Sequence, residues 1–310
     1  MKNVIAPIEK SLLRQELNSR TFIRKANNGN NEIYILNQHN APNTLLEIGR
    51  LREETFRAAG GGTGLDCDLD DFDTCEKCYE QLIVWNPEEE EIVGGYRYIR
   101  CGEARIANGN YHLATTELFT FSDKFKNDYL PNTIELGRSF VQPKYQPAVN
   151  NRKGLFSLDN LWDGLGALVI DNPDIKYFFG KVTTYRDYNV EARDYILRFM
   201  QHYFPDNENL VTPHRAVVPS TPTDEFAAQL KSLDYKEGHK VLNQHVRSLG
   251  ENIPPLVNAY MNLSATMKTF GTAVNDEFGD VDETGILVTI ADIYPTKKER
   301  HVATYLSQKK

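Results

Sequence analysis

Glu135-Leu136-Gly137-Arg138-Ser139-Phe140-Val141 is the stretch on which the fold prediction for this chain depends. It lies in a segment, residues 133–141, whose composition is typical of a β-strand. Successive side chains of a strand point to opposite faces, so Glu135 and Arg138, three residues apart, are expected on different faces of the sheet. A β-bulge at Gly137 would turn both side chains to the same face.

Strand-like and helix-like segments alternate on both sides of this stretch. Strands are predicted at residues 32–36, 81–85, 91–99, 177–183, 269–274 and 285–290, and helices at 1–25, 43–59, 154–170, 190–203 and 224–250. This order predicts an α/β fold. Because no linker interrupts the pattern, we expect a single domain over residues 1–310, with a helical extension at 1–25 and a partly helical insert at about 205–250.

The 310 residues carry a net charge of −8, from 35 basic and 43 acidic side chains. This balance argues against general binding of nucleic acid, which requires a basic surface. No apolar stretch reaches the roughly 18 to 20 residues that span a bilayer, and the first residues lack the apolar core of a secretory signal. We therefore expect a cytoplasmic protein with, at most, transient contact with the inner face of the membrane.

The cysteines lie in one region of the chain, at Cys67, Cys75, Cys78 and Cys101. Cys75-x-x-Cys78 has a spacing found in zinc and redox sites, but the second pair lacks the spacing of a zinc ribbon. Asp66-x-Asp68-x-Asp70 is similar to the start of a calcium loop, but Asp71 and Lys77 stand where such a loop needs its glycine and its final glutamate. The prediction is therefore reduced thiols and no metal, and the alternative is a structural zinc site in which Cys67 and Cys101 complete four ligands.

Several short motifs occur in a characteristic order. They are Leu51-Arg52-x-x-x-Phe56, Asp71-Phe72-Asp73 with Gln81-Leu82-Ile83-Val84, Gly95-Tyr96-Arg97, Glu135-Leu136-Gly137-Arg138, Ile253-Pro254-Pro255-Leu256-Val257-x-x-Tyr260 and Phe278-Gly279. In this order and spacing they resemble the acyl-carrier-protein-dependent ornithine and glycine N-acyltransferases of the GNAT superfamily, a branch often labelled haemolysin-like. The resemblance covers residues 44–203 and 253–290, and it extends distantly to acyl-homoserine-lactone synthases.

This resemblance implies a GNAT-like fold, with a mixed, mostly antiparallel central sheet flanked by helices and two central strands that splay apart near residues 135–141 and 177–183. It implies that the phosphopantetheine thioester of an acyl-carrier protein lies in that gap. It also implies transfer of a 3-hydroxylated fatty acyl group to the amine of a small amino acid, glycine or ornithine, which gives an aminolipid precursor. No cofactor is expected to stay bound, since the acyl-phosphopantetheine thioester is a co-substrate.

Amide formation from a thioester needs a neutral amine and hydrogen-bond donors for the developing oxyanion. A carboxylate such as Glu135 is suited to accept the proton of the attacking ammonium group. Arg138 would keep Glu135 ionised or bind the carboxylate of the acceptor through two guanidinium nitrogens, and Arg97 is the alternative carboxylate clamp. The structural alternative is that Glu135 and Arg138 form only an ion pair.

Residues earlier in the chain bear on substrate binding. Arg52 and Phe56 share one helix face. There Phe56 would line the acyl pocket or the core, and Arg52 would face a cleft, pair with an acid or extend into solvent. Residues 65–91 hold eleven acids and a single basic residue. Because the resembled family has its acceptor site beside this region, Asp71 and Asp73 are predicted to attract the amine.

The loop after the predicted strand at 133–141 indicates the acyl donor. Coenzyme A-dependent GNAT enzymes carry a Q/R-x-x-G-x-G/A loop there, whose N–H groups hold a pyrophosphate at a helix N-terminus. Residues 151–157 keep only Gly154 of these glycines. Acyl-carrier protein, whose phosphopantetheine has one phosphate, is therefore the predicted donor and partner. Arg152 and Lys153 are predicted to contact this acidic protein, and the alternative is an ordinary solvated loop.

Three other functions remain open. They are synthesis of an acyl-homoserine-lactone-type signal, a GNAT-fold binding role without activity, and a coenzyme A-dependent acetyltransferase. Acyl transfer to S-adenosylmethionine would distinguish the signal synthase from the amino-acid acyltransferase. The sequence has no Gly-x-Ser-x-Gly motif, which argues against a serine hydrolase.

Overall fold

Helices alternate with β-strands along the chain in the computed structural model. The structure describes residues 1–107, 109–146 and 156–308. The chain divides into two units. The first contains Met1–Ala114, Pro131–Lys176 and Tyr294–Lys310, and the second contains Thr115–Leu130 and Tyr177–Ile293. The predicted α/β class, with mostly antiparallel strands flanked by helices, is confirmed. No described helix is long and apolar enough to cross a membrane.

Five antiparallel strands form the sheet of the first unit. Their order is β1 (Phe22–Lys25), β2 (Glu32–Leu36), β3 (Glu80–Asn86), β4 (Glu91–Arg100) and β8 (Thr133–Val141). A small hairpin joins β5 (Ile106–Ala107) to β6 (Asn110–Tyr111). The inner residues of β3 and β4 are buried on both faces of the sheet. This explains why their sequences are mostly apolar rather than alternating, with Gln81 and Arg97 as buried polar exceptions.

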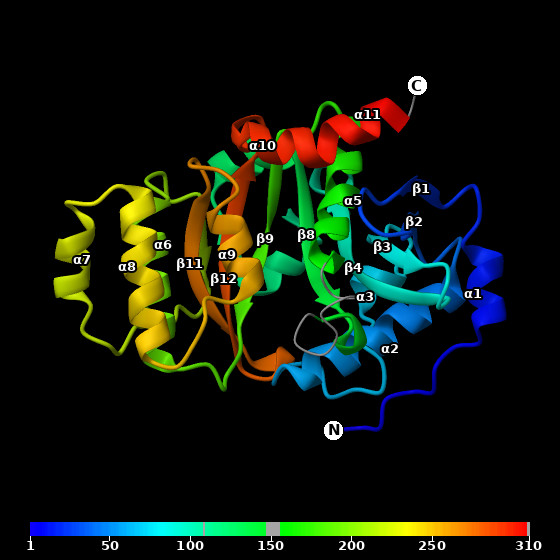
Figure 1. Cartoon of the computed structure of the whole chain (residues 1–310), viewed down its shortest axis with the longest axis horizontal. Coiled ribbons are helices and arrows are strands. Elements are labelled where there is room, and N and C mark those ends of the chain that lie inside the picture. The colour runs from blue at the N-terminus through cyan, green and yellow to red at the C-terminus, as the bar shows by residue number, and fades with distance from the viewer. Residues whose placement is uncertain (108, 147–155, 309–310) are drawn as a thin grey trace. The chain divides into compact units, whose positions relative to one another are not determined.

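The α-helices of this unit pack on the sheet and on one another. They are α1 (Lys10–Glu16), α2 (Pro42–Ala58), α3 (Asp71–Thr74), α5 (Ser157–Asp171), α10 (Pro295–Lys298) and α11 (Thr304–Gln308). On one face α5 lies close to β3, since Gly164 approaches the side chain of Leu82 (Figure 1). Gln81 points the other way, to the face where α2 and α3 supply the polar residues described below.

A three-stranded antiparallel sheet forms the centre of the second unit. Its order is β9 (Tyr177–Thr184), β12 (Val281–Thr289) and β11 (Lys268–Asn275), and β7 (Phe119–Phe121) pairs with β10 (Val211–Pro213). The helices are α6 (Val190–Tyr203), α7 (Asp224–Leu230), α8 (Tyr235–Ser248) and α9 (Pro255–Met261), with α7 and α8 packed on α6 (Figure 1). Phe121, Phe125, Phe179 and Phe270 form an aromatic core with ring centroids 5.1–5.9 Å apart.

The N-terminal segment differs from its prediction. The helix ends at Glu16, and Phe22–Lys25 is a strand. The turn-rich residues 27–31 fold the chain back, so Phe22 pairs with Tyr34 and the segment extends the sheet. The helical extension predicted over residues 1–25 is therefore wrong outside Lys10–Glu16, since residues 1–9 are not helical and residues 22–25 form a strand. At Phe22–Lys25, pairing with a neighbouring strand outweighs local helical periodicity.

Other predicted segments agree more closely with the structure. The strands predicted at 32–36 and 133–141 have the predicted bounds, and residues 205–250 contain α7 and α8. The single-domain assignment stays a prediction. So does the splay of the strands near 135–141 and 177–183, which belong to different units.

The close approach of β4 and β8 gives a first testable prediction. A Cβ atom at Gly94 would lie 2.3 Å from the carbonyl oxygen of Phe140, whereas one at Gly137 would meet nothing closer than Arg97 Nε at 3.6 Å. Gly94→Ala should lower the free energy of unfolding by about 1–3 kcal/mol, because a backbone ladder must shift. Urea denaturation of Gly94→Ala, with Gly137→Ala as the matched control, measures this. An equal loss in both variants would contradict the steric argument.

Candidate functional site

A β-bulge interrupts the strand that carries Glu135 and Arg138. On β4, Gly95 and Arg97 are two residues apart, yet their partners on β8, Phe140 and Gly137, are three apart. The extra residue lies directly after Gly137, and Arg138 has a φ of 48° in the left-handed region. The bulge foreseen as an alternative is therefore present, and it turns the Arg138 side chain away from the face that regular strand alternation would give it.

Arg97 is the buried cation at the centre of the site. Its Nη1 lies 2.7 Å from both oxygens of Asp70 and 3.0 Å from Asp73 Oδ2, and its side chain is 3% exposed. The rings of Phe72 and Tyr79 lie 5.4 and 5.2 Å from the guanidinium carbon. Burial alone would lower the pKa of Arg97, but the carboxylates of Asp73 and Asp70 raise it above its ordinary value.

Arg52 on α2 is a second buried cation, with no exposed surface. Its Nε lies 3.0 Å from Asp68 Oδ2, and its two terminal nitrogens donate to the two oxygens of Asp73, each at 3.2 Å. Burial alone would raise the pKa of Asp73, but Arg52 and Arg97 hold it well below its ordinary value. Arg52 therefore pairs with acidic residues, Asp68 and Asp73, which was one of its three predicted alternatives.

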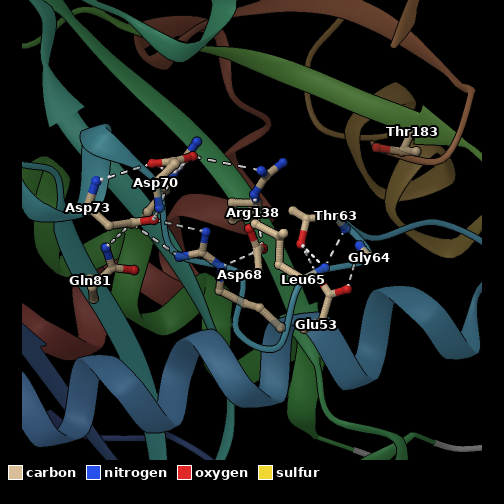
Figure 2. Close-up of polar contacts among 12 residues, drawn as sticks. Glu53, Thr63, Gly64, Leu65, Asp68, Asp70, Asp73, Gln81, Arg138 and Thr183 are labelled. Carbon is tan, nitrogen blue, oxygen red and sulfur yellow. Dashed lines mark hydrogen bonds and ion pairs between the residues drawn. The ribbon is translucent and has the colours of Figure 1, made fainter. Parts of the chain in front are cut away.

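Arg138 completes this group of charges. Its Nε lies 3.1 Å from Asp68 Oδ2, and its Nη2 lies 3.8 Å from Asp70 Oδ2. We call Arg52, Arg97, Arg138, Asp68, Asp70 and Asp73 the arginine–aspartate cluster, part of which Figure 2 shows. Arg138 is 15% exposed and Asp70 is 30% exposed, while the other members are almost fully buried. The cluster therefore reaches solvent mainly through Asp70 and Arg138.

The short helix α3 places two of the aspartates. Asp70 caps the helix and accepts from the N–H of Asp73, while the Asp73 carboxylate accepts from the N–H of Asp70. This reciprocal capping box fixes both carboxylates towards the sheet. Gln81 on β3 donates to Asp73 Oδ1 at 2.9 Å (Figure 2).

Glu135 lies on β8 and is 1% exposed. The hydroxyl of Tyr79 donates to Glu135 Oε1 at 2.8 Å and accepts from the N–H of Ala114 at 2.9 Å. Burial and the nearby Glu135 raise the pKa of Tyr79 well above its ordinary value, so the phenol stays protonated and remains a donor. The arrangement is a carboxylate held in one orientation by a phenol.

The other predicted site residues have different surroundings. Asp71 lies outside the arginine–aspartate cluster, with its Oδ2 3.1 Å from His112 Nε2 and 4.0 Å from Arg105 Nη2. Phe56 is buried, 4% exposed, on the same helix as Arg52. Arg152, Lys153 and Gly154 lie outside the described residues.

Sequence reasoning missed Asp68 and Asp70, which it weighed only as positions of a calcium loop. The signal for Asp70 was its spacing from Asp73, because a capping residue followed three residues later by a carboxylate is similar to the pattern of a capping box. No comparable local signal marks Asp68, whose partners Arg52 and Arg138 come from other elements.

Thiol chemistry is not favoured at Cys67 or Cys101. Burial raises the pKa of Cys67 to about 11, and burial together with Glu135 raises that of Cys101 well above its ordinary value. Both thiols therefore stay protonated near neutral pH and are poor nucleophiles.

Comparison with known proteins places these features in a family. The family described as the acetyltransferase (GNAT) domain matches residues 51–151. A glycine N(alpha)-acyltransferase of Bacteroides thetaiotaomicron is 53% identical over 99% of this chain and 91% of its own length. One of Phocaeicola vulgatus with the same name is 50% identical over 99% of this chain and 95% of its own.

Two solved structures are more distantly similar. The acyl-homoserine-lactone synthase LasI shares 14% identity over 50% of this chain and 74% of its own, with a TM-score of 0.31. The coenzyme A-dependent acyl-homoserine lactone synthase BjaI, solved with S-adenosylmethionine and isopentyl-CoA, shares 12% over 89% of this chain and 88% of its own, with a TM-score of 0.38. These similarities are too weak to support an argument about function.

The resemblance based on the motifs is therefore confirmed by relatives that match nearly the whole chain. The chain belongs to the GNAT acyltransferases, in one family with these two proteins, and it is an N-acyltransferase.

Proposed function

We propose that this N-acyltransferase moves a fatty acyl group, 3-hydroxylated as in the resembled family, from acyl-carrier protein to the α-amine of glycine. The choice of glycine over ornithine rests on whole-chain identities of 53% and 50% to two proteins named for glycine. The product is an N-acylglycine, which would serve as an aminolipid precursor.

The observation that carries the mechanism is the bulge of β8, which sets Arg138 at the partly exposed side of the arginine–aspartate cluster. Arg138 is suited to bind the glycine carboxylate because its guanidinium has several donors and is 15% exposed. Both Arg138 and Arg97 pair with aspartates, but Arg97 is less suited because its side chain is only 3% exposed. We therefore assign the carboxylate clamp to Arg138 rather than to Arg97.

Glu135 is the proposed base, acting directly or through one water molecule. The glycine ammonium group gives one proton to Glu135, and the neutral nitrogen attacks the carbonyl carbon of the thioester. The carbon–sulfur bond then breaks, the nitrogen loses its second proton, and the thiolate of phosphopantetheine takes up a proton as it leaves. The Tyr79 hydroxyl, 2.8 Å from Glu135, orients the carboxylate and stabilises its charge.

The donor assignment rests on the sequence of the loop after β8. Gly154 is the single glycine among residues 151–157, which weakens the case for a coenzyme A pyrophosphate site. Arg152 and Lys153 stay the proposed contacts of the acidic carrier protein.

The proposed function is tested by supplying the purified chain with 3-hydroxyacyl-carrier protein, or with the matching acyl-CoA, and one acceptor at a time. Glycine with the carrier-protein donor should release the most thiol and give N-acylglycine by mass spectrometry, and ornithine should be slower. Faster turnover with S-adenosylmethionine, giving a lactone, would instead identify a signal synthase. Faster turnover with acyl-CoA would contradict the donor assignment.

Glu135→Gln tests the base. The amide oxygen still accepts from Tyr79, so the fold should be kept while kcat falls by about 10² or more. The matched control is Tyr79→Phe, which removes the hydrogen bond but leaves the carboxylate, and which should lower kcat less. Unchanged turnover in a folded Glu135→Gln protein would remove the base role from Glu135.

Arg138→Lys tests the carboxylate clamp. A lysine keeps the charge but loses the planar pair of donors, so KM for glycine should rise by about tenfold or more with a smaller change in kcat. Arg100→Lys is the control, because Arg100 is 32% exposed and forms a 2.6 Å ion pair with Asp174 away from the cluster. An unchanged KM in Arg138→Lys would place the glycine carboxylate elsewhere.

A further inference from the structure

Three side chains with different metal-binding atoms meet beside the arginine–aspartate cluster. A carboxylate oxygen of Asp71, the Sγ of Cys75 and an imidazole nitrogen of His112 all lie within 4.8 Å of one another. Asp71 begins α3, and Cys75 follows its last residue and donates its N–H to the Asp71 carbonyl at 2.9 Å. Residues four apart in a helical turn lie on one side, so Asp71 and Cys75 face His112 together.

The imidazole of His112 is held in place. Its ring stacks on Phe72 with centroids 4.5 Å apart, and its backbone N–H donates to the Arg105 carbonyl at 2.7 Å. Its Nε2 is buried, lies 3.1 Å from Asp71 Oδ2 and makes no hydrogen bond with the described residues. The contact with the Asp71 carboxylate therefore lacks hydrogen-bond geometry, and a cation bound by both groups would satisfy this buried nitrogen.

The distances suit a tetrahedral ion. Zinc bonds of about 2.0–2.1 Å to nitrogen, 2.0–2.2 Å to oxygen and 2.3 Å to sulfur require ligand atoms roughly 3.3–3.6 Å apart. Small side-chain rotations reach this from the present separations of up to 4.8 Å. A sulfur, nitrogen and oxygen set favours zinc or a similar transition metal over calcium or magnesium, which take oxygen ligands.

We propose that Asp71, Cys75 and His112 bind one zinc-type divalent ion, with water at the fourth position. The ion would connect α3 to the segment that follows β6. The sequence predicted no metal because the cysteine spacings and the acidic run do not match a known ligand pattern and the histidines are scattered along the chain. This ligand set takes one cysteine of Cys75-x-x-Cys78 and a histidine far along the chain.

The role of this ion is structural. Phe72 lies between Asp71 and Asp73 in the sequence. Its ring stacks on the His112 imidazole, and its ring centroid lies 5.4 Å from the guanidinium carbon of Arg97. The same helix and its N-cap residue supply Asp73 and Asp70 to the arginine–aspartate cluster. An ion that binds only the folded protein stabilises it by linkage, so zinc would hold α3 and its aspartates in position.

One cation already lies near the proposed ligands. Arg105 Nη2 is 4.0 Å from Asp71 Oδ2, and both side chains are more than half exposed. The guanidinium is therefore a weak competitor that can move into solvent when the ion binds.

The test uses the full chain, stripped of metal with a chelator and titrated with Zn²⁺ or Co²⁺. Calorimetry and elemental analysis should give one tightly bound zinc per chain, and Co²⁺ should give a thiolate charge-transfer absorption. Cys75→Ser and His112→Ala should each weaken zinc binding by at least about tenfold, since each loses a ligand. Cys78→Ser is the matched control and should bind zinc as the parent does.

Thermal unfolding gives a second measurement. Zinc should raise the melting temperature of the parent and of Cys78→Ser, and should have little effect on Cys75→Ser. The serine variant keeps Phe72 and His112 in place, so it remains informative if His112→Ala fails to fold. Absence of stoichiometric zinc binding in the parent, or equal loss of binding in Cys75→Ser and Cys78→Ser, would overturn the proposal. Neither outcome depends on the acyl donor or acceptor.

Discussion

The rest of the first unit depends on the contacts that the carboxylate of Asp73 makes. It is fully buried and binds Arg52 on α2, Arg97 on β4 and Gln81 on β3, so one side chain connects α3 to a long helix and two strands. A buried carboxylate is stable only with such partners, and the two buried guanidinium groups need it equally. The packing of α2 and α3 on the sheet therefore requires the arginine–aspartate cluster.

The proposed chemistry follows from this cluster through β8. Asp68, which Arg52 binds, lies 3.1 Å from Arg138. The left-handed backbone conformation of Arg138 costs about 1–3 kcal/mol of folding free energy. The ion contacts with Asp68 and Asp70 offset that cost and hold the side chain at the edge of the cluster. Glu135 comes three residues earlier on the same strand and is oriented by Tyr79. A single bulged strand therefore carries both the proposed base and the proposed carboxylate clamp.

The sequence predicted much of this fold and less of the site. Glu32–Leu36 and Thr133–Val141 were predictable because apolar strands between turn residues have a clear local pattern. Phe22–Lys25 was not, since it becomes a strand only by pairing with β2. In the acidic run, Asp73 was identified but Asp71 was chosen over Asp70, because composition does not show where α3 begins. The bulge after Gly137 was foreseen only as an alternative, since a register shift depends on the partner strand.

In the proposed mechanism, β8 binds and activates glycine through Arg138 and Glu135. A crystal structure of the chain with glycine and a stable thioether analogue of acyl-phosphopantetheine tests it most directly. We expect the glycine carboxylate on the Arg138 guanidinium, with the amine within hydrogen-bond reach of Glu135 or of one water bound to it. A glycine carboxylate bound away from Arg138, or an amine that faces away from Glu135, would rule out these roles for the two residues.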